Sequence, residues 1–121
     1  MIFHFDGGGK MTNQIVSDTE LEECLNWLSV HDELMAEAHA SVDKYDELRK
    51  AIIAELMMLS GKKSAKEKEA EALSSTEYRQ FLDEREIATK KDKLLKLRAS
   101  YMNTKIDVWR TIQANQRRGQ I

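Results

Sequence analysis

The chain has no proline, one cysteine and five glycines among its 121 residues, and it has no long apolar run. Without proline, long stretches contain no residue that would break a helix. The single cysteine, Cys24, cannot form an internal disulfide. No run of about 18 consecutive apolar residues occurs, so the sequence does not indicate a membrane span. Since nothing suggests secretion either, we expect a cytoplasmic protein.

Aromatic residues are also scarce, at 7%, whereas 33% of the residues are charged and 41% are hydrophobic. This balance is typical of long helices and coiled coils rather than of a compact mixed fold. A long helical hairpin of only 121 residues needs a partner to bury its apolar stripe fully. We therefore expect a single all-α domain that forms homo-oligomers.

The charges are divided between two long segments. Residues 17–60 hold eleven acidic and three basic side chains, whereas residues 74–121 hold six acidic and eleven basic ones. The formal net charge of −2 hides this division. Two segments of opposite sign predict helices that pair with each other and one basic surface that attracts an anionic partner.

The first 16 residues are expected to form a flexible leader. Residues 1–10 end in Gly7-Gly8-Gly9-Lys10 and are followed by a second methionine, Met11. We expect Met11 to be the natural start, with residues 1–10 a translated leader or an addition from cloning. A phosphate-binding loop is the weaker interpretation, because the pattern Gly-x-x-x-x-Gly-Lys-Ser/Thr is missing.

Residues 17–60 are predicted to form an acidic helical rod. Ser17 and Glu20 have the spacing of a capping box, in which both side chains satisfy free backbone amides. A polar interruption at residues 30–32 predicts a kink or a short break, which would divide a brief helix over residues 17–29 from a longer one. Ser60-Gly61 predicts a left-handed stop. The apolar stripe of this rod, at helical spacing, is expected to contain Leu21, Leu25, Leu28, Met35, Ala38, Val42, Tyr45, Leu48, Ile52, Leu56 and Leu59.

Residues 61–73 are expected to form a charged connector, in which a turn is followed by a weak helix. Ser74 and Glu77 repeat the capping-box spacing and open a basic rod over residues 74–118. The two rods have nearly equal lengths. Helices of equal length joined by a short connector favour a long antiparallel helical hairpin or coiled coil.

The second rod carries two neighbouring apolar stripes with seven-residue spacing, and either can form core or oligomer contacts. The first stripe contains Phe81, Ala88, Leu95, Met102 and Trp109. The second stripe contains Ile87, Leu94, Tyr101 and Val108. A two-stranded coil needs only one narrow seam, so this width predicts contacts with the first rod and with a neighbouring protomer. An intramolecular bundle is the alternative.

Nine basic residues and only two acidic ones lie between Lys90 and Arg118. This density predicts contacts with a phosphate backbone, and the affinity would fall steeply with salt because binding releases counterions. Pairing with the acidic first rod is the alternative. The nine candidates for nucleic-acid binding are Lys90, Lys91, Lys93, Lys96, Arg98, Lys105, Arg110, Arg117 and Arg118.

Trp109 could stack an unpaired base, but it continues the heptad of Phe81 and is therefore predicted to lie in the core. No catalytic residue, cofactor or metal site is predicted. His31 and His39 lack the spacing of a ligand pair, and Cys24 has no neighbouring base and is expected to be a buried thiol.

Three features carry a resemblance to a known family. Residues 25–31 read Leu-Asn-Trp-Leu-Ser-Val-His, the first rod ends at Leu59-Ser60-Gly61 before two lysines, and a Trp-Arg-x-x-x-Ala-Asn-x-Arg pattern runs from Trp109 to Arg117. Through the first two features and its basic second rod, the chain resembles the recombination mediator proteins of tailed phages over residues 20–118. Through the Trp-Arg ending it also resembles small helical proteins that are encoded beside phage recombination genes. The resemblance implies a non-enzymatic oligomer in a phage-infected bacterial host. Such a protein binds single-stranded DNA and loads a recombinase onto strands coated by single-strand-binding protein. The acidic first rod departs from the basic character expected of that family.

We therefore expect a DNA recombination or replication accessory protein that binds single-stranded DNA and a recombinase or single-strand-binding protein, and no membrane. The alternative is a helical protein–protein interaction module without nucleic-acid binding, either a host-directed phage inhibitor or an assembly scaffold. The salt dependence of binding to single-stranded DNA separates these two functions.

Overall fold

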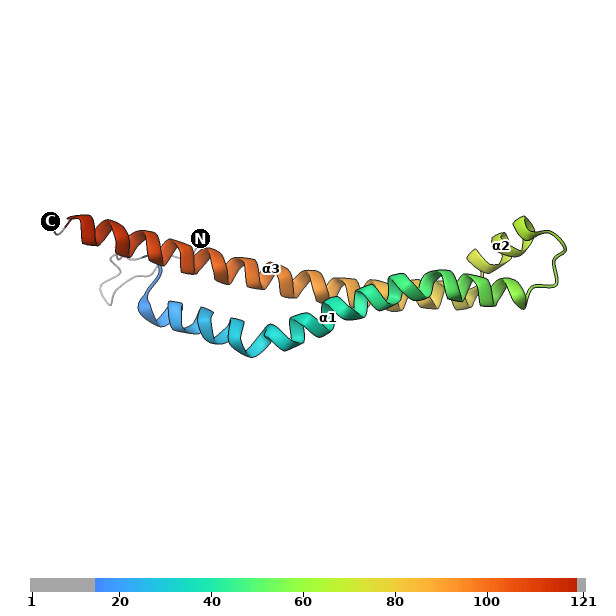
Figure 1. Ribbon diagram of the computed structural model, residues 1–121, viewed down its shortest axis with the longest axis horizontal. Coiled ribbons are helices and arrows are strands. Elements are labelled where there is room, and N and C mark those ends of the chain that lie inside the picture. The colour runs from blue at the N-terminus through green and yellow to red at the C-terminus, as the bar shows by residue number, and fades with distance from the viewer. Residues whose placement is uncertain (1–14, 120–121) are drawn as a thin grey trace, which may run out of the picture. The chain divides into compact units, whose positions relative to one another are not determined.

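Figure 1 shows the computed structural model of the chain, which describes residues 15–119. Its helices are α1 (Asp18–Met58), α2 (Ala65–Leu73) and α3 (Thr76–Gly119). The described residues contain no strand, so the all-α prediction is confirmed. Most of the expected leader, residues 1–14, lies outside the described residues. Its last residue, Val16, is buried, with 3% of its surface exposed.

The beginning of α1 is fixed by Ser17. The backbone N–H of Glu20 donates to the Ser17 hydroxyl over 3.1 Å, which confirms the serine half of the predicted capping box. The Glu20 carboxylate accepts a hydrogen bond from Lys105. The helix then runs without a break to Met58, so the interruption expected at residues 30–32 does not end it.

The end of α1 differs from the predicted left-handed stop. Gly61 does not have a positive φ, and the last turn closes instead through the backbone N–H of Ser60, which donates to the Met57 carbonyl over 3.1 Å. The Ser60 hydroxyl donates to Glu71 over 2.8 Å and accepts from the backbone N–H of Lys62 over 3.1 Å. Side-chain hydrogen bonds of Ser60 thus organise this turn.

The predicted connector contains the nine-residue helix α2. Its cap is Ser64, whose hydroxyl accepts from the backbone N–H of Glu67 over 3.1 Å. The cap of α3 is Ser75, one residue later than predicted, because its hydroxyl accepts from the N–H of Tyr78 over 3.1 Å. The Ser74 hydroxyl donates back to the Ala70 carbonyl over 2.9 Å and so belongs to the end of α2.

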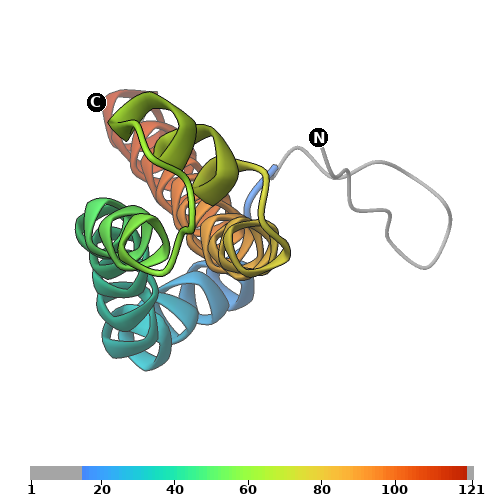
Figure 2. The same ribbon diagram turned by 90° about the vertical axis from the view of Figure 1, so that its right-hand side faces the viewer.

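The chain divides into two compact units, and both long helices contribute to each of them. The first unit contains the described residues up to Asp32 and from Lys96 onward, and the second contains Glu33–Leu95. In the second unit, α2 lies beside the end of α1 and the beginning of α3 (Figure 2). Ala72 of α2 is buried there, with 2% of its surface exposed.

Within the second unit, the segments of α1 and α3 run in opposite directions. His39 lies 3.6 Å from Asp92, Asp46 accepts from Arg85 at 2.7 Å, and Arg49 donates to the Tyr78 hydroxyl over 3.0 Å. Residues later in α1 therefore contact residues earlier in α3.

The first unit shows the same direction of pairing. The indole N–H of Trp109 donates to Asp18 over 2.9 Å, and the Lys105 ammonium lies 3.2 Å from Glu20. The core of this unit includes Cys24, which is 1% exposed.

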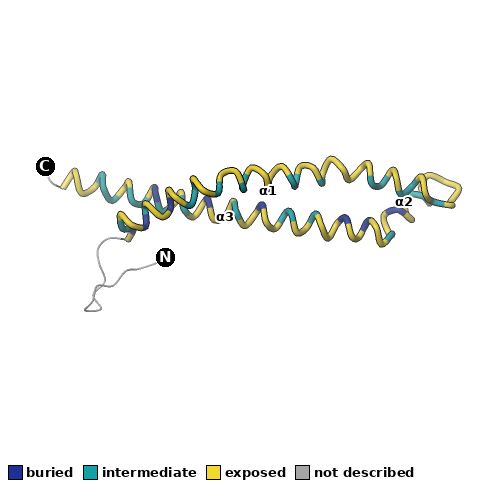
Figure 3. The backbone as a smooth tube through the Cα atoms, turned by 90° about the horizontal axis from the view of Figure 1, so that it is seen from below, coloured by how far each residue is buried: buried dark blue, intermediate teal, exposed yellow. Residues whose placement is uncertain are grey.

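Burial along α3 follows a seam whose members are spaced alternately by three and four residues (Figure 3). One half is the first predicted stripe, in which Phe81 is buried and the other members are half-buried. The second predicted stripe lies largely outside this seam, because Ile87, Leu94 and Tyr101 are 70%, 56% and 44% exposed. The other half of the seam consists of Tyr78, Arg85, Asp92, Ala99 and Ile106.

The predicted stripe of α1 is also displaced in part. Leu25 and Leu59, two members of the stripe, are 50% and 83% exposed. Ala38, another member, is buried as predicted, and so is Cys24, which lies outside the stripe. Trp27 and His31 are half-buried, with their rings stacked at a centroid distance of 4.2 Å. The inward face of α1 therefore includes polar and sulfur-containing side chains that an apolar pattern does not reveal.

Candidate nucleic-acid interface

Eight of the nine candidate cations are exposed on α3. In the second unit these are Lys90, Lys91 and Lys93. In the first unit they are Lys96, Arg98, Arg110, Arg117 and Arg118. Long charged side chains keep their heads in water when their helix face is exposed. The eight are therefore available to an anionic partner within their own units.

Lys90 and Arg110, for example, make ion pairs along the surface of α3. Lys90 lies 3.4 Å from Glu86, and Arg110 lies 3.8 Å from Asp107. The Lys90 and Arg110 side chains are 76% and 72% exposed. Exposed pairs of this kind contribute only about 0–1 kcal/mol, so phosphate oxygens can replace the carboxylates at little cost.

Lys105, the ninth candidate, occupies a different environment. Its side chain is 19% exposed, it contacts Glu20, and its ammonium lies 4.9 Å from the centroid of the Tyr101 ring. Desolvation lowers the pKa of Lys105, but hydrogen bonds to Glu20 and Tyr101 and the Glu20 charge outweigh it, so the pKa is raised overall. Lys105 is therefore a structural cation of the first unit, which the sequence did not indicate.

Some cations of α3 pair with acidic residues of α1, as the alternative interpretation expects. Arg85 pairs with Asp46 in the second unit, and Lys105 pairs with Glu20 in the first. Arg85 was not among the nine candidates, and its side chain lies on the seam. Cross-helix pairing thus uses cations at or beside the seam, while the other eight candidates keep exposed side chains.

Trp109 is half-buried and donates its indole N–H to Asp18 of α1. The ring therefore lies beside α1 within the first unit. The nearby Arg110, Arg117 and Arg118 remain exposed at the end of α3.

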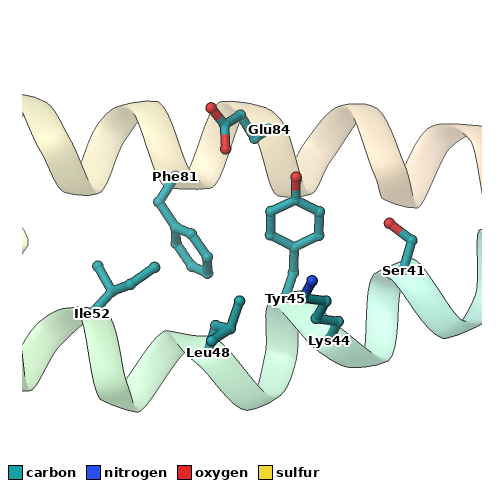
Figure 4. A pocket seen from close by; sticks show the side chains of 7 residues that line it. All are labelled: Ser41, Lys44, Tyr45, Leu48, Ile52, Phe81 and Glu84. Carbon is teal, nitrogen blue, oxygen red and sulfur yellow. The ribbon is translucent and has the colours of Figure 1, made fainter.

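A pocket of about 340 Å³ opens beside the seam of the second unit (Figure 4). Phe81 points from α3 toward α1, where its ring lies 5.7 Å from that of Tyr45 between centroids. Leu48 and Ile52 complete the apolar wall, and Glu84 lies at its edge. Ser41 and Lys44 also line the pocket. Its apolar side chains pack α1 against α3, and we assign no chemistry to this pocket.

Cys24 is buried, and burial raises the pKa of its thiol, with Lys105 lowering it and Glu20 and Glu23 raising it further. The thiol therefore stays protonated at neutral pH and is a poor nucleophile. No group of three or more His, Cys, Asp or Glu side chains that could hold a metal ion occurs in residues 15–119.

None of the helices in the described part of the chain is both long and apolar enough to cross a membrane. Comparisons with protein-family models, with curated proteins and with solved structures found no match for this chain.

Proposed function

We propose that the chain is a non-enzymatic accessory protein of phage-type DNA recombination or replication, which binds single-stranded DNA through the exposed cations of α3. The supporting observation is that eight of nine candidate cations keep exposed side chains although an acidic helix packs against α3 in each unit. Binding would then come mainly from the release of counterions condensed on the DNA.

The proposed molecule is a long antiparallel helical hairpin that forms homo-oligomers in the cytoplasm of an infected host. The opposite direction of α1 and α3 within each unit supports the hairpin. The apolar side chains of Ile87 and Leu94, which are 70% and 56% exposed in the described part of the chain, support self-association. A recombinase or single-strand-binding protein is the proposed protein partner.

The test is to replace Arg110, Arg117 and Arg118 together by alanine and to measure binding of a labelled oligonucleotide by fluorescence anisotropy. We expect weaker binding to every sequence, because phosphate contacts carry no sequence information. The slope of log affinity against log salt should fall by about two, since each lost contact to a single strand contributes roughly 0.7.

The matched control replaces the exposed residues Lys62, Lys63 and Lys66 by alanine. This triple substitution removes the same charge from another part of the chain. It should leave the salt slope unchanged. Equal loss in the control and in the arginine variant would mean that net charge alone governs binding, and the α3 interface would be abandoned.

A helical protein–protein interaction module is the second candidate. It is favoured by the exposed apolar side chains, of which Ile87 and Leu97 are 70% and 69% exposed. If the unmodified chain shows no binding to single-stranded DNA at low salt, this function replaces the first.

A further inference from the structure

The first unit contains an open pocket of about 260 Å³ that is lined by the residues preceding α1, by Glu20 of α1 and by α3. Its walls are mainly apolar: Ile15 and Val16 lie on one side, and Tyr101 and Val108 lie on the other. Thr104 and the ion pair of Glu20 with Lys105 supply its polar groups. Both the helix and the segment before α1 are needed to form it.

The size of the pocket limits what can fill it. Sites for drug-sized ligands usually measure about 300–1,000 Å³. A pocket of about 260 Å³ therefore suits one flat ring system rather than a larger molecule. An aromatic side chain and aliphatic neighbours favour a planar group with an apolar face.

The polar groups favour a ring with hydrogen-bonding edges. The Thr104 hydroxyl donates to the Ser100 carbonyl over 2.9 Å, which leaves its oxygen as an acceptor. The Lys105 ammonium lies over the Tyr101 ring and next to Glu20, so cationic and anionic groups lie close together at the pocket. A nucleobase has both the flat apolar face and the polar edges that this lining suits.

We propose that this pocket receives one unpaired base of single-stranded DNA, with the base against the Tyr101 ring. This inference rests on the proposed function, since it deepens the same DNA-binding activity. Arg98 is exposed and lies three residues before Tyr101, so both side chains project from the same side of α3. Arg98 then contacts a phosphate next to the captured base.

The pocket also gives a preference for single strands. A base in a duplex is paired and stacked, and it must be extruded before it can enter a protein pocket. An unpaired base enters without that cost. Stacking on an aromatic ring tolerates any base, because every base has a flat π face.

The test compares an intact oligonucleotide with an abasic one of the same length and the same number of phosphates. We expect the unmodified chain to bind the intact strand roughly five- to 150-fold more tightly, the range that stacking of one base supplies. Fluorescence of the base analogue 2-aminopurine in the strand should also be quenched on binding.

Two variants locate this preference. Tyr101→Ala removes the ring, and Thr104→Trp fills the pocket from an exposed position that tolerates a larger side chain. Both should bring the affinity ratio of intact to abasic strands close to one. Asn103→Trp is the matched control, because Asn103 is exposed and does not line the pocket, and it should keep the ratio.

The result separates this inference from the function on which it rests. Equal affinity of the unmodified chain for intact and abasic strands, without quenching, overturns the base pocket while the arginine interface stands. A complete lack of binding at low salt overturns both.

Discussion

Glu20 and Lys105 show how one residue far along the chain decides the role of another. Their side chains are 10% and 19% exposed. The 3.2 Å contact between the Lys105 ammonium and the Glu20 carboxylate joins two residues that lie 85 positions apart in the sequence. A partly buried lysine without a partner would lose much of its solvation. Burial beside an acidic residue therefore makes Lys105 part of the packing, although its sequence neighbours are the basic residues that we propose bind DNA.

Replacing Lys105 by methionine should destabilise the protein by roughly 3 kcal/mol, because it leaves the Glu20 carboxylate buried without its cation. Urea denaturation at pH 7 measures this loss. Replacing both residues by methionine should restore most of the stability, whereas Lys91→Met, at an exposed position, should change it by less than about 0.5 kcal/mol. A Lys105→Met variant as stable as the unmodified protein would contradict the role assigned to the pair.

The same pair predicts how stability depends on pH. Because the pKa of Lys105 is raised in the folded chain, its contribution is complete below the unfolded value of about 10.4. The contribution disappears as the pH rises through the folded pKa. The stability difference between the unmodified protein and Lys105→Met should therefore shrink above about pH 10.4, which denaturation at pH 7 and in alkaline buffer can show.

The helix ends are determined by serines, and each serine acts through a particular bond. Ser75 accepts from the N–H of Tyr78 and donates to the Ala72 carbonyl over 2.6 Å, so it joins the end of α2 to the beginning of α3. Ser74, immediately before it, only donates to carbonyls of α2. An unsatisfied N–H at a helix start costs stability, whereas an end carbonyl can be solvated by water.

Ser75→Ala should therefore destabilise the protein by about 1 kcal/mol, the usual loss for a serine cap. Thermal unfolding followed by circular dichroism at one fixed protein concentration measures the effect. Ser74→Ala is the matched control and should cost less than about 0.5 kcal/mol. The opposite order of the two variants would move the start of α3 to the position that the sequence suggested.

The elements themselves follow from local sequence, whereas their details depend on contacts between helices. The absence of proline and the Ser-x-x-Glu spacing at Ser17 predict the helical class and the start of α1. The same spacing at Ser64 lies within the predicted charged connector, where the sequence indicates a weak helix but not its bounds. Half of the α3 seam was missed because Arg85 and Asp92 occupy it, and their partners lie on α1.

At the scale of the whole molecule, the division of charge predicts which helix offers exposed cations, because most charged side chains on a helix surface stay in water. It cannot predict which cation becomes buried, since that depends on the register of two segments far apart in the chain. It also cannot predict the pocket at Tyr101, whose opposite wall comes from Ile15 and Val16. The sequence could thus predict a basic surface on α3, but it could not predict the pocket beside it.

Self-association is the property that depends on the entire chain, and the second apolar stripe of α3 is its proposed surface. Ile87→Gln together with Leu94→Gln should leave the helix intact, because both side chains are exposed at 70% and 56%. Each apolar side chain that becomes buried contributes about 1.5–3 kcal/mol, so losing two should weaken association by at least about 100-fold. Sedimentation equilibrium at several concentrations measures the change.

The control replaces Met58 and Leu59 by glutamine. These two side chains lie outside the stripe and are even more exposed, at 85% and 83%, so their replacement should leave the mass unchanged. If the unmodified protein sediments as a monomer at tens of micromolar, or if both pairs of substitutions reduce the mass equally, the stripe is not the association surface, and the exposure of Ile87 and Leu94 must serve a different partner.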